Sequence, residues 1–262
     1  MNMAVRTLSA WAAAGEKPEI LYWVGCAASF DDRAQKVARA FVKLLDAAGV
    51  KWGILGTEES CTGDPAKRAG NDFLFQMLAL QNIQTLQAYE VKEIVATCPH
   101  CFNTLKNEYP QLGGTFKVWH HTQYLHHLIQ TGRLQLPTSN GVEDSIVFHD
   151  PCYLGRGNGE YEAPRVLLRR VGAQLREAER HRDFALCCGA GGAQMFKEPE
   201  PGHKDINIER TEELLRLHPK RIAVGCPFCM TMLTDGVKHA GKQGEVRVQD
   251  VAEILAERLG LI

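Results

Sequence analysis

The sequence lacks the features that most directly assign a protein to a functional class. Its formal net charge is −1, so charge gives no reason to expect nucleic acid or an anionic membrane as a partner. No apolar run approaches the ~18 residues of a membrane span. A Gly-x-Gly-x-x-Gly fingerprint for flavin or nicotinamide is missing, as is a ferredoxin-type Cys-x-x-Cys-x-x-Cys run. The 262 residues, 45% of them apolar, nevertheless suffice for a substantial core.

Residues 1–19 form an N-terminal extension with one small apolar stretch, Leu8 to Gly15. The stretch is too short and too rich in alanine for an export signal, so we expect a helix packed on the domain or on a partner. Without such a signal, and with an odd number of cysteines, disulfides are the least favoured use of the thiols. We therefore expect a cytoplasmic protein, with any membrane association made through partners.

The nine cysteines fall into two copies of one pattern, and none is left over. Corresponding cysteines lie 126 positions apart, and the two Cys-x-x-Cys steps lie 128 apart. The repeat predicts two domains of ordinary size, residues 20–136 and 142–262, with a linker at 137–141. The first thiol set comprises Cys26, Cys61, Cys98 and Cys101, and the second comprises Cys152, Cys187, Cys188, Cys226 and Cys229. In this register Thr62 of the first copy, in Cys61-Thr62-Gly63, takes the place of Cys188 in Cys187-Cys188-Gly189.

Strand and helix patterns alternate in both copies. One helix is expected to bury Phe73, Met77, Leu80, Ile83 and Leu86. The alternation predicts an α/β fold with two tandem halves related by an approximate two-fold axis, each a mainly parallel sheet flanked by helices. The strands are expected at 20–24, 52–55, 93–96 and 116–119, and again at 146–148, 184–186, 222–224 and 246–248.

Each thiol set should gather at one edge of its sheet, because its cysteines follow strands whose carboxyl ends meet there. Helices beginning at Pro99 and Pro227 would aim backbone N–H groups at an anionic cluster, and a proline costs little at that position.

Several polar residues near the cysteines allow more than one interpretation. His149 and Asp150, just before Cys152, either handle protons or hydrogen-bond the loop structurally. His120 and Asp250 occupy equivalent positions and are interpreted as helix caps, not as ligands.

Thiolates select soft metals, here zinc, copper(I) or an iron–sulfur cluster. The four cysteines of the first thiol set suit a zinc ion as well as a cluster. The five of the second exceed what tetrahedral zinc needs, and the adjacent pair Cys187-Cys188 is awkward for a single ion. An iron–sulfur cluster fits the second set better.

A cysteine, a gap of about 35 residues, Cys-Cys-Gly, a similar gap and Cys-x-x-Cys resemble the cysteine-rich CCG domain found in the B-type subunit of heterodisulfide reductase. The same domain occurs in iron–sulfur subunits of glycolate oxidase, anaerobic glycerol-3-phosphate dehydrogenase and lactate-utilisation complexes. The resemblance extends twice over the chain from Ile20 onward. It implies a noncubane [4Fe–4S] cluster on the second thiol set. Because Thr62 cannot supply a fifth sulfur, a cubane [4Fe–4S] cluster is expected on the first set, with zinc as the alternative.

The resemblance further implies an iron–sulfur subunit of a cytoplasmic oxidoreductase complex, which transfers electrons and acts on a disulfide or thiol at the second cluster. Electrons would come from a ferredoxin-type subunit or a flavoprotein. One alternative is a pure relay toward a quinone-linked partner. An alternative of another class is a zinc-binding structural subunit. No catalytic residue is assigned beyond the second cluster.

Overall fold

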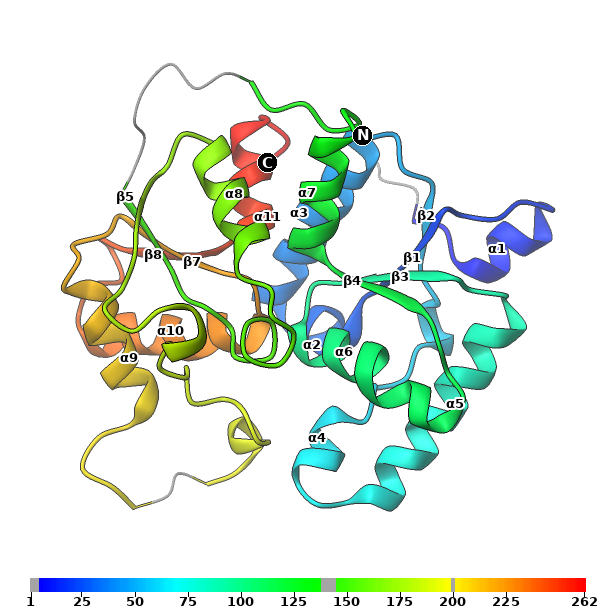
Figure 1. Cartoon of the computed structure of the whole chain (residues 1–262), viewed down its shortest axis with the longest axis horizontal. Helices are drawn as coiled ribbons and strands as arrows, with labels where there is room; N and C mark the ends of the chain where they lie inside the picture. Colours follow the sequence, from blue (N-terminus) through cyan, green and yellow to red (C-terminus); the bar gives the residue numbers. More distant parts are fainter. Residues whose placement is uncertain (1–4, 138–144, 199–200) are drawn as a thin grey trace.

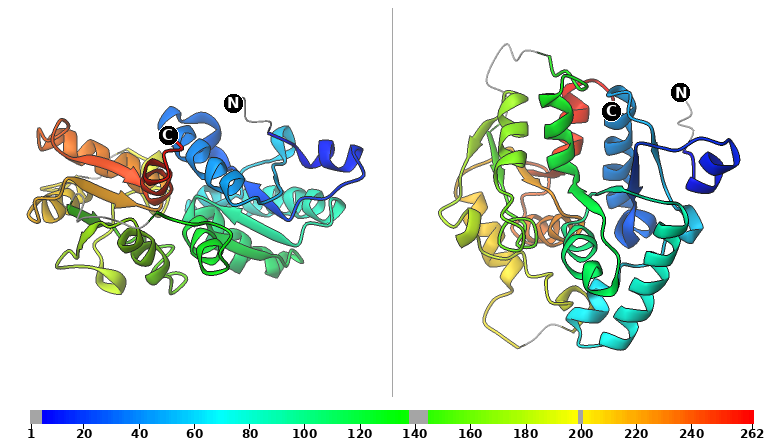
Figure 2. Two further views of the ribbon diagram at one scale, coloured as in Figure 1. Left: turned by 90° about the horizontal axis from the view of Figure 1, so that it is seen from above. Right: turned by 45° about the vertical axis from the view of Figure 1, so that its right-hand side comes forward.

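The computed structural model describes residues 5–137, 145–198 and 201–262. Its two halves lie side by side, each with its own sheet (Figure 1; Figure 2, left). Positions 138–141 of the expected linker and 142–144 of the expected second domain lie outside the described residues. The strands are β1 Ile20–Trp23, β2 Trp52–Gly53, β3 Glu93–Ala96 and β4 Lys117–His120, then β5 Ser145–Phe148, β6 Gln174–Arg176, β7 Arg221–Val224 and β8 Arg247–Asp250.

Helices connect the strands in both halves. The N-terminal one, α1, packs on the first half through buried Leu8 and Trp11, and the Trp11 indole donates to Trp52 O. Among the described residues no helix is long and apolar enough to cross a membrane. The helices are α1 Leu8–Ala13, α2 Gly25–Phe30, α3 Asp32–Ala47, α4 Asp64–Arg68, α5 Asp72–Ala88, α6 Pro99–Asn103, α7 His121–Gln130, α8 Glu162–Arg170, α9 Ile206–Leu215, α10 Pro227–His239 and α11 Val251–Arg258.

The two sheets have the same topology. The strand order is β2-β1-β3-β4 in the first and β6-β5-β7-β8 in the second, and all neighbours are parallel. Parallel strands need crossover connections, which the intervening helices and loops provide. The predicted α/β fold of two repeated halves is confirmed.

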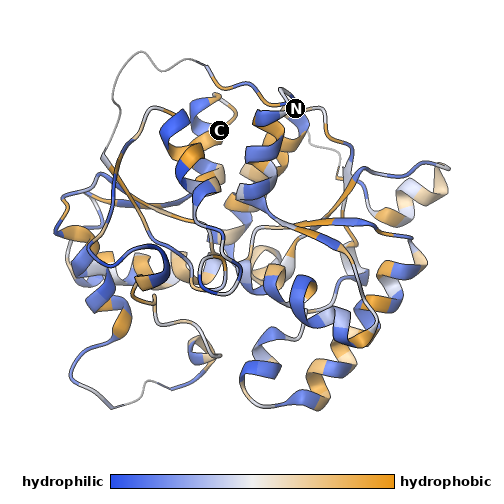
Figure 3. Ribbon diagram, viewed as in Figure 1, coloured by the Kyte–Doolittle hydropathy of each residue, from blue (hydrophilic) through white to orange (hydrophobic). Residues whose placement is uncertain are grey.

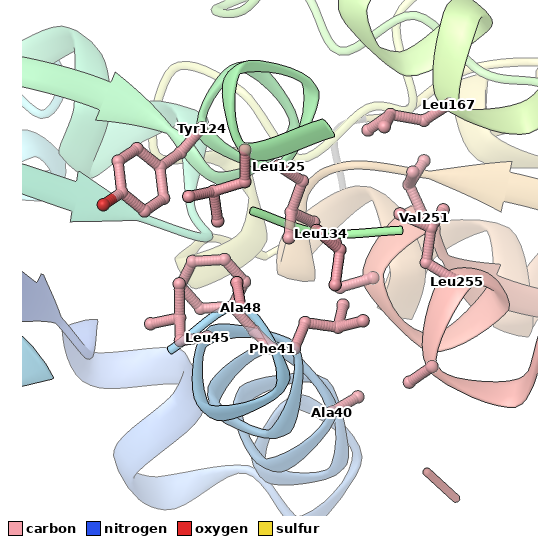
Figure 4. Close-up of a cluster of buried hydrophobic side chains, with 14 of the residues drawn as sticks. Ala40, Phe41, Leu45, Ala48, Tyr124, Leu125, Leu134, Leu167, Val251 and Leu255 are labelled. Atoms are coloured by element: carbon pink, nitrogen blue, oxygen red, sulfur yellow. The ribbon is translucent and has the colours of Figure 1, made fainter. Parts of the chain in front are cut away.

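One hydrophobic core joins the halves. Helices α3, α7, α8 and α11 meet between the two sheets (Figure 1), and Figure 4 shows Phe41, Leu45, Leu125, Leu167 and Leu255 converging there. All five are fully buried, and each such side chain contributes about 1.5–3 kcal/mol relative to exposure. This shared core fixes how the two sheet edges face each other.

The prediction of a strand at 184–186 is wrong. A 3-10 turn at Arg182–Phe184 stands there, and the strand beside β5 is β6, where Leu175 pairs with Ile146. The Arg156 side chain donates to the carbonyls of Asp183 and Ala185 at 3.2 and 2.6 Å, so these groups find partners without a strand. The segment is apolar, yet Phe184 is exposed.

The expected core face of α5 is only half correct. Ile83 and Leu86 are buried, whereas Phe73, Met77 and Leu80 are exposed. Figure 3 shows hydrophobic residues along this helix. The exposed residues belong to its N-terminal part, beyond the edge of the sheet that covers its second half (Figure 1).

Candidate metal centre

The first thiol set gathers at the carboxyl edge of the first sheet. Cys26 lies in the first turn of α2, Cys61 in the loop before α4, and Cys98 caps α6, which contains Cys101. Cys26 interacts with Cys61, and Cys101 interacts with Cys98. A pocket opens here, lined among others by Cys26, Cys61, Thr62, Cys98, Cys101 and Phe228.

The second thiol set gathers in the same way. Cys152 follows β5, Cys187 and Cys188 lie in the loop after the 3-10 turn, and Cys226 caps α10, which contains Cys229. Cys152 and Cys188 both interact with Cys187, and the sulfurs of Cys188 and Cys229 lie within 4.8 Å of each other. Cys61 and Cys187 do not follow strands directly, contrary to expectation, but longer loops still bring them to the edge.

A glycine makes the same contact in both loops. The Gly63 N–H donates to Cys61 Sγ at 3.5 Å, and the Gly189 N–H donates to Cys187 Sγ at 3.3 Å. Their φ angles are +87° and +93°, a region that side chains disfavour. At Gly63 a Cβ would also lie 2.9 Å from the Phe75 ring. In each loop the glycine therefore donates its backbone N–H to the sulfur of the cysteine two residues before it.

Hydrogen bonding among the thiols gives the cysteines of each set different pKa values. Hydrogen bonding from Cys26 lowers the pKa of Cys61 to about 7. Hydrogen bonding with Cys152 and Cys188 places the pKa of Cys187 far below its ordinary value, and the same bond raises the pKa of Cys188 to about 12. The pKa is lowered at Cys61 and Cys98 in the first set and at Cys187 in the second, and a metal that binds at either set would displace the protons of the other thiols.

The two thiol sets are neighbours. Phe228 packs both on the hydrophobic cluster that contains Cys98 and Cys101 and on the hydrophobic cluster that contains Cys226 and Cys229. Cys98 and Cys226 are buried and both cap the helix of their Cys-Pro-x-Cys step. The helix starts predicted at Pro99 and Pro227 are confirmed. Two centres held by these sets would be direct neighbours.

Aromatic side chains cover this junction. The His100 ring lies 4.2 Å from Tyr153 and 5.1 Å from Phe228, measured between ring centroids. Its Nδ1 lies 3.0 Å from Asp64 Oδ2, which fixes the ring. Residues beside the cysteines of one half therefore pack on those of the other.

The His149-Asp150 pair is held by two buried arginines. Arg165 binds both carboxylate oxygens of Asp150 at 2.7 and 2.8 Å. Although burial favours the neutral acid, this guanidinium holds the pKa of Asp150 below its usual value. His149 Nδ1 accepts from Arg210 Nε at 3.1 Å, and burial together with the Arg210 charge lowers the pKa of His149 to about 3. These contacts support the structural interpretation of the pair.

The interpretation of His120 and Asp250 as caps is confirmed. Asp250 accepts from Ala252 N at 2.8 Å at the start of α11, and His120 is the N-cap residue of α7. Both also join the halves. His120 Nε2 lies 3.0 Å from Gly225 O, and Asp250 Oδ1 lies 2.7 Å from His121 Nε2.

Comparison with known proteins identifies the family. The model of the CCG cysteine-rich domain matches twice, over residues 20–106 and 146–234. The chain belongs to this family. The two matches contain both thiol sets and end before β4 and β8, the last strand of each sheet.

Three curated relatives match over nearly the whole chain. An EtfAB:quinone oxidoreductase of Syntrophomonas wolfei is 47% identical, over 92% of this chain and 34% of that protein. The "Probable iron-sulfur-binding oxidoreductase FadF" of Bacillus subtilis is 46% identical, over 93% and 34%. One subunit of the dihydromethanophenazine:CoB--CoM heterodisulfide reductase of Methanosarcina barkeri is 33% identical, over 94% and 60%. The chain spans about a third of the length of the first two relatives.

Residues other than the cysteines line the centre and escaped the sequence analysis. Glu59 accepts from the N–H groups of Val24 and Gly25 at 3.0 and 2.6 Å, and burial raises its pKa to about 7. Trp23 is buried in the same core cluster as two thiols of the first set. The 126-residue register could have singled out Trp23, because it aligns with His149.

Proposed function

We propose that this chain is an iron–sulfur electron-transfer subunit of a cytoplasmic oxidoreductase complex. The observation that carries the proposal is the adjacency of two thiol-rich centres, since Phe228 packs both on the hydrophobic cluster that contains Cys98 and on the hydrophobic cluster that contains Cys226. The relatives named as iron–sulfur-binding and quinone oxidoreductases support the same class. All nine cysteines are free thiols, as such a role requires.

The donor sets fit iron–sulfur centres. Each set consists of cysteine thiols, and thiolates are the usual ligands of [4Fe–4S] clusters. In this proposal Cys26, Cys61, Cys98 and Cys101 hold a cubane cluster, and Cys152, Cys187, Cys188, Cys226 and Cys229 hold a noncubane one. When bound, such clusters supply one-electron transfer.

The protein's own contribution is position and shielding. The two Cys-Pro-x-Cys helices present Cys98 and Cys226 to each other, which provides a short path between the centres. The rings of His100, Tyr153 and Phe228 pack together across the boundary between the halves, beside that path. Thr62, with only a hydroxyl, leaves the first centre saturated by four thiolates and suited to a relay.

Electrons must enter from a partner, a flavoprotein or a ferredoxin-type subunit. The similarity to an EtfAB:quinone oxidoreductase supports a route toward a quinone-linked partner.

A second candidate is redox chemistry on a small disulfide or thiol at the second centre. The fifth thiol of the second set and the similarity to a heterodisulfide reductase favour it. The two roles differ in one observable. A small disulfide should oxidise the reduced second centre directly under the second role, and leave its spectrum unchanged under pure relay.

The decisive experiment is anaerobic purification followed by iron, zinc and acid-labile sulfide analysis with a visible spectrum. Two four-iron clusters require about eight iron and eight sulfide per chain. About four iron with one zinc would remove the relay through the first centre. Zinc without iron would leave only the structural alternative.

A further inference from the structure

Two ring residues occupy the same place in the two halves. Trp23 and His149 lie 126 positions apart, and each stands three residues before the first cysteine of its set. Side chains alternate along a strand, so Ile20 and Tyr22 of β1 face the core shared by the halves. Trp23 points to the opposite side, into the core cluster that contains Cys98 and Cys101.

The second half repeats this alternation. Ile146 and Phe148 of β5 face the shared core, and Val147 lies with Cys188, Cys226 and Cys229 on the other side. His149 comes next in line. The pleat of the sheet thus turns the residue two positions after a site-facing one toward the thiols, Trp23 after Leu21 and His149 after Val147.

Both rings end in a buried nitrogen without a partner. Trp23 is 1% exposed and His149 is 0% exposed. Within the described part of the chain, neither Trp23 Nε1 nor His149 Nε2 has a hydrogen-bond partner. Buried N–H groups in proteins are almost always satisfied, so an acceptor that binds at these places would complete both.

Each ring lies near thiols of its own set. A His149 ring nitrogen, Cys188 Sγ and Cys229 Sγ lie within 4.8 Å of one another. Since Nδ1 is engaged by Arg210, Nε2 is the nitrogen left for the sulfurs. In the first half, the point where a Gly25 Cβ would lie is 3.4 Å from Cys101 Sγ and 4.0 Å from Trp23 Cδ1, the carbon bonded to Nε1.

Contacts also fix where the protons are. A guanidinium only donates, so Arg210 Nε–H to Nδ1 leaves the neutral His149 ring protonated on Nε2. Glu213 and the Arg180 carbonyl, each at 2.9 Å, hold Arg210 in place. An indole nitrogen is always a donor. Both halves therefore present a ring N–H to their centre.

We propose that Trp23 and His149 are matched positioning residues, each donating its ring N–H to a sulfur of the neighbouring cluster and thereby raising that cluster's reduction potential. The inference rests on the proposed iron–sulfur function. Hydrogen bonds to cluster sulfurs favour the reduced, more negative state, and they are one of the determinants of its potential.

The test replaces each donor and keeps its surroundings. His149→Asn retains an acceptor near Nδ1 for Arg210 and removes the donor at Nε2, whereas His149→Gln reaches the Nε2 position with an amide N–H. We expect His149→Asn to lower the equilibrium constant for reduction of the second cluster about tenfold, which is a fall of about 59 mV in the reduction potential of a one-electron couple. His149→Gln should restore most of this loss. Trp23→Phe should shift only the first cluster. Trp119→Phe, which removes an indole N–H bonded to Glu93, should shift neither.

Redox titration followed by paramagnetic resonance measures these shifts. If the variants contain the full amount of iron and their reduction potentials are unchanged, this inference is wrong and the proposed function is unaffected. Absence of iron would overturn both. If a variant fails to load, wild-type protein with ¹⁵N-histidine decides: a nitrogen and an exchangeable proton coupled to the second cluster are expected, and their absence refutes the donor role of His149.

Discussion

The ion pair between Asp150 and Arg165 anchors the loop that carries Cys152, and its removal should be costly. Both side chains are buried, at 2% and 0% exposure, and Arg182 N donates to the same carboxylate at 2.8 Å. Breaking a buried pair by removing one partner costs about 3–5 kcal/mol. Arg165 keeps two bonds to Glu177 at 2.8 Å, so Asp150→Asn belongs at the lower end, about 3 kcal/mol. With about 2–4 °C per kcal/mol in a chain of this size, the Tm should fall by about 6–12 °C.

The matched control is Glu19→Gln. Glu19 binds Arg133 in the same two-bond arrangement, at 2.7 and 3.3 Å, but the side chains are 42% and 36% exposed. An exposed pair contributes only about 0–1 kcal/mol. Thermal and urea unfolding of the metal-free proteins at pH 7 measures both losses. Equal losses in the two variants would refute the reasoning from burial.

The same pair predicts a pH dependence. The folded pKa of Asp150 lies below the unfolded value near 3.8, so its contribution is complete above that value and is lost as the pH falls through the folded pKa. The stability difference between wild type and Asp150→Asn should persist from pH 7 to about 5 and shrink in stronger acid. A difference that instead grew on acidification would contradict the depressed pKa.

Three further substitutions have defined outcomes. Cys188→Ser should remove the second centre and spare the first, and unchanged iron content and paramagnetic signals from both would exclude Cys188 as a ligand. Thr62→Cys, at a buried position beside the first thiol set, should move the spectrum of the first centre toward that of the second. Gly236→Ala would place a Cβ 2.0 Å from Thr211 Oγ1 and should cost about 1–3 kcal/mol in urea unfolding, whereas Gly244→Ala, with open space around it, should not show such packing strain.

The duplication of the fold could be predicted because the sequence separation between corresponding cysteines is nearly constant. Cysteines at a constant offset, each near a short apolar run, place equivalent loops at equivalent sheet edges whatever the details between them. Strand β3 appears where predicted, at Glu93–Ala96, because its three apolar residues, 94–96, are buried and the strand has neighbours on both sides. The prediction at 184–186 failed because Arg156 satisfies that backbone from a distant loop, a tertiary contact without a local signal.

That the two thiol sets are neighbours could not be predicted from the sequence, for a similar reason. It depends on how two sheets are oriented, and helices α3, α7, α8 and α11 fix that orientation through a core drawn from both halves. Cross-boundary bonds such as Arg33 to Glu253, at 2.6 and 2.7 Å, add to it. Periodicity identifies each helix as amphipathic but does not say that the four apolar faces meet one another.

Within this repeated frame, two of the positions that differ lie beside the centres. Thr62 stands against Cys188, which changes the number of sulfurs, and Trp23 stands against His149, which changes the ring that offers an N–H. Both differences act on the same two quantities, the net charge of a cluster and the hydrogen bonds to its sulfurs, and these determine reduction potential. On the proposed function, a duplication would by itself produce two equivalent centres with no preferred direction between them. Divergence at these positions gives two neighbours of unequal potential, which is what directional transfer between the centres requires.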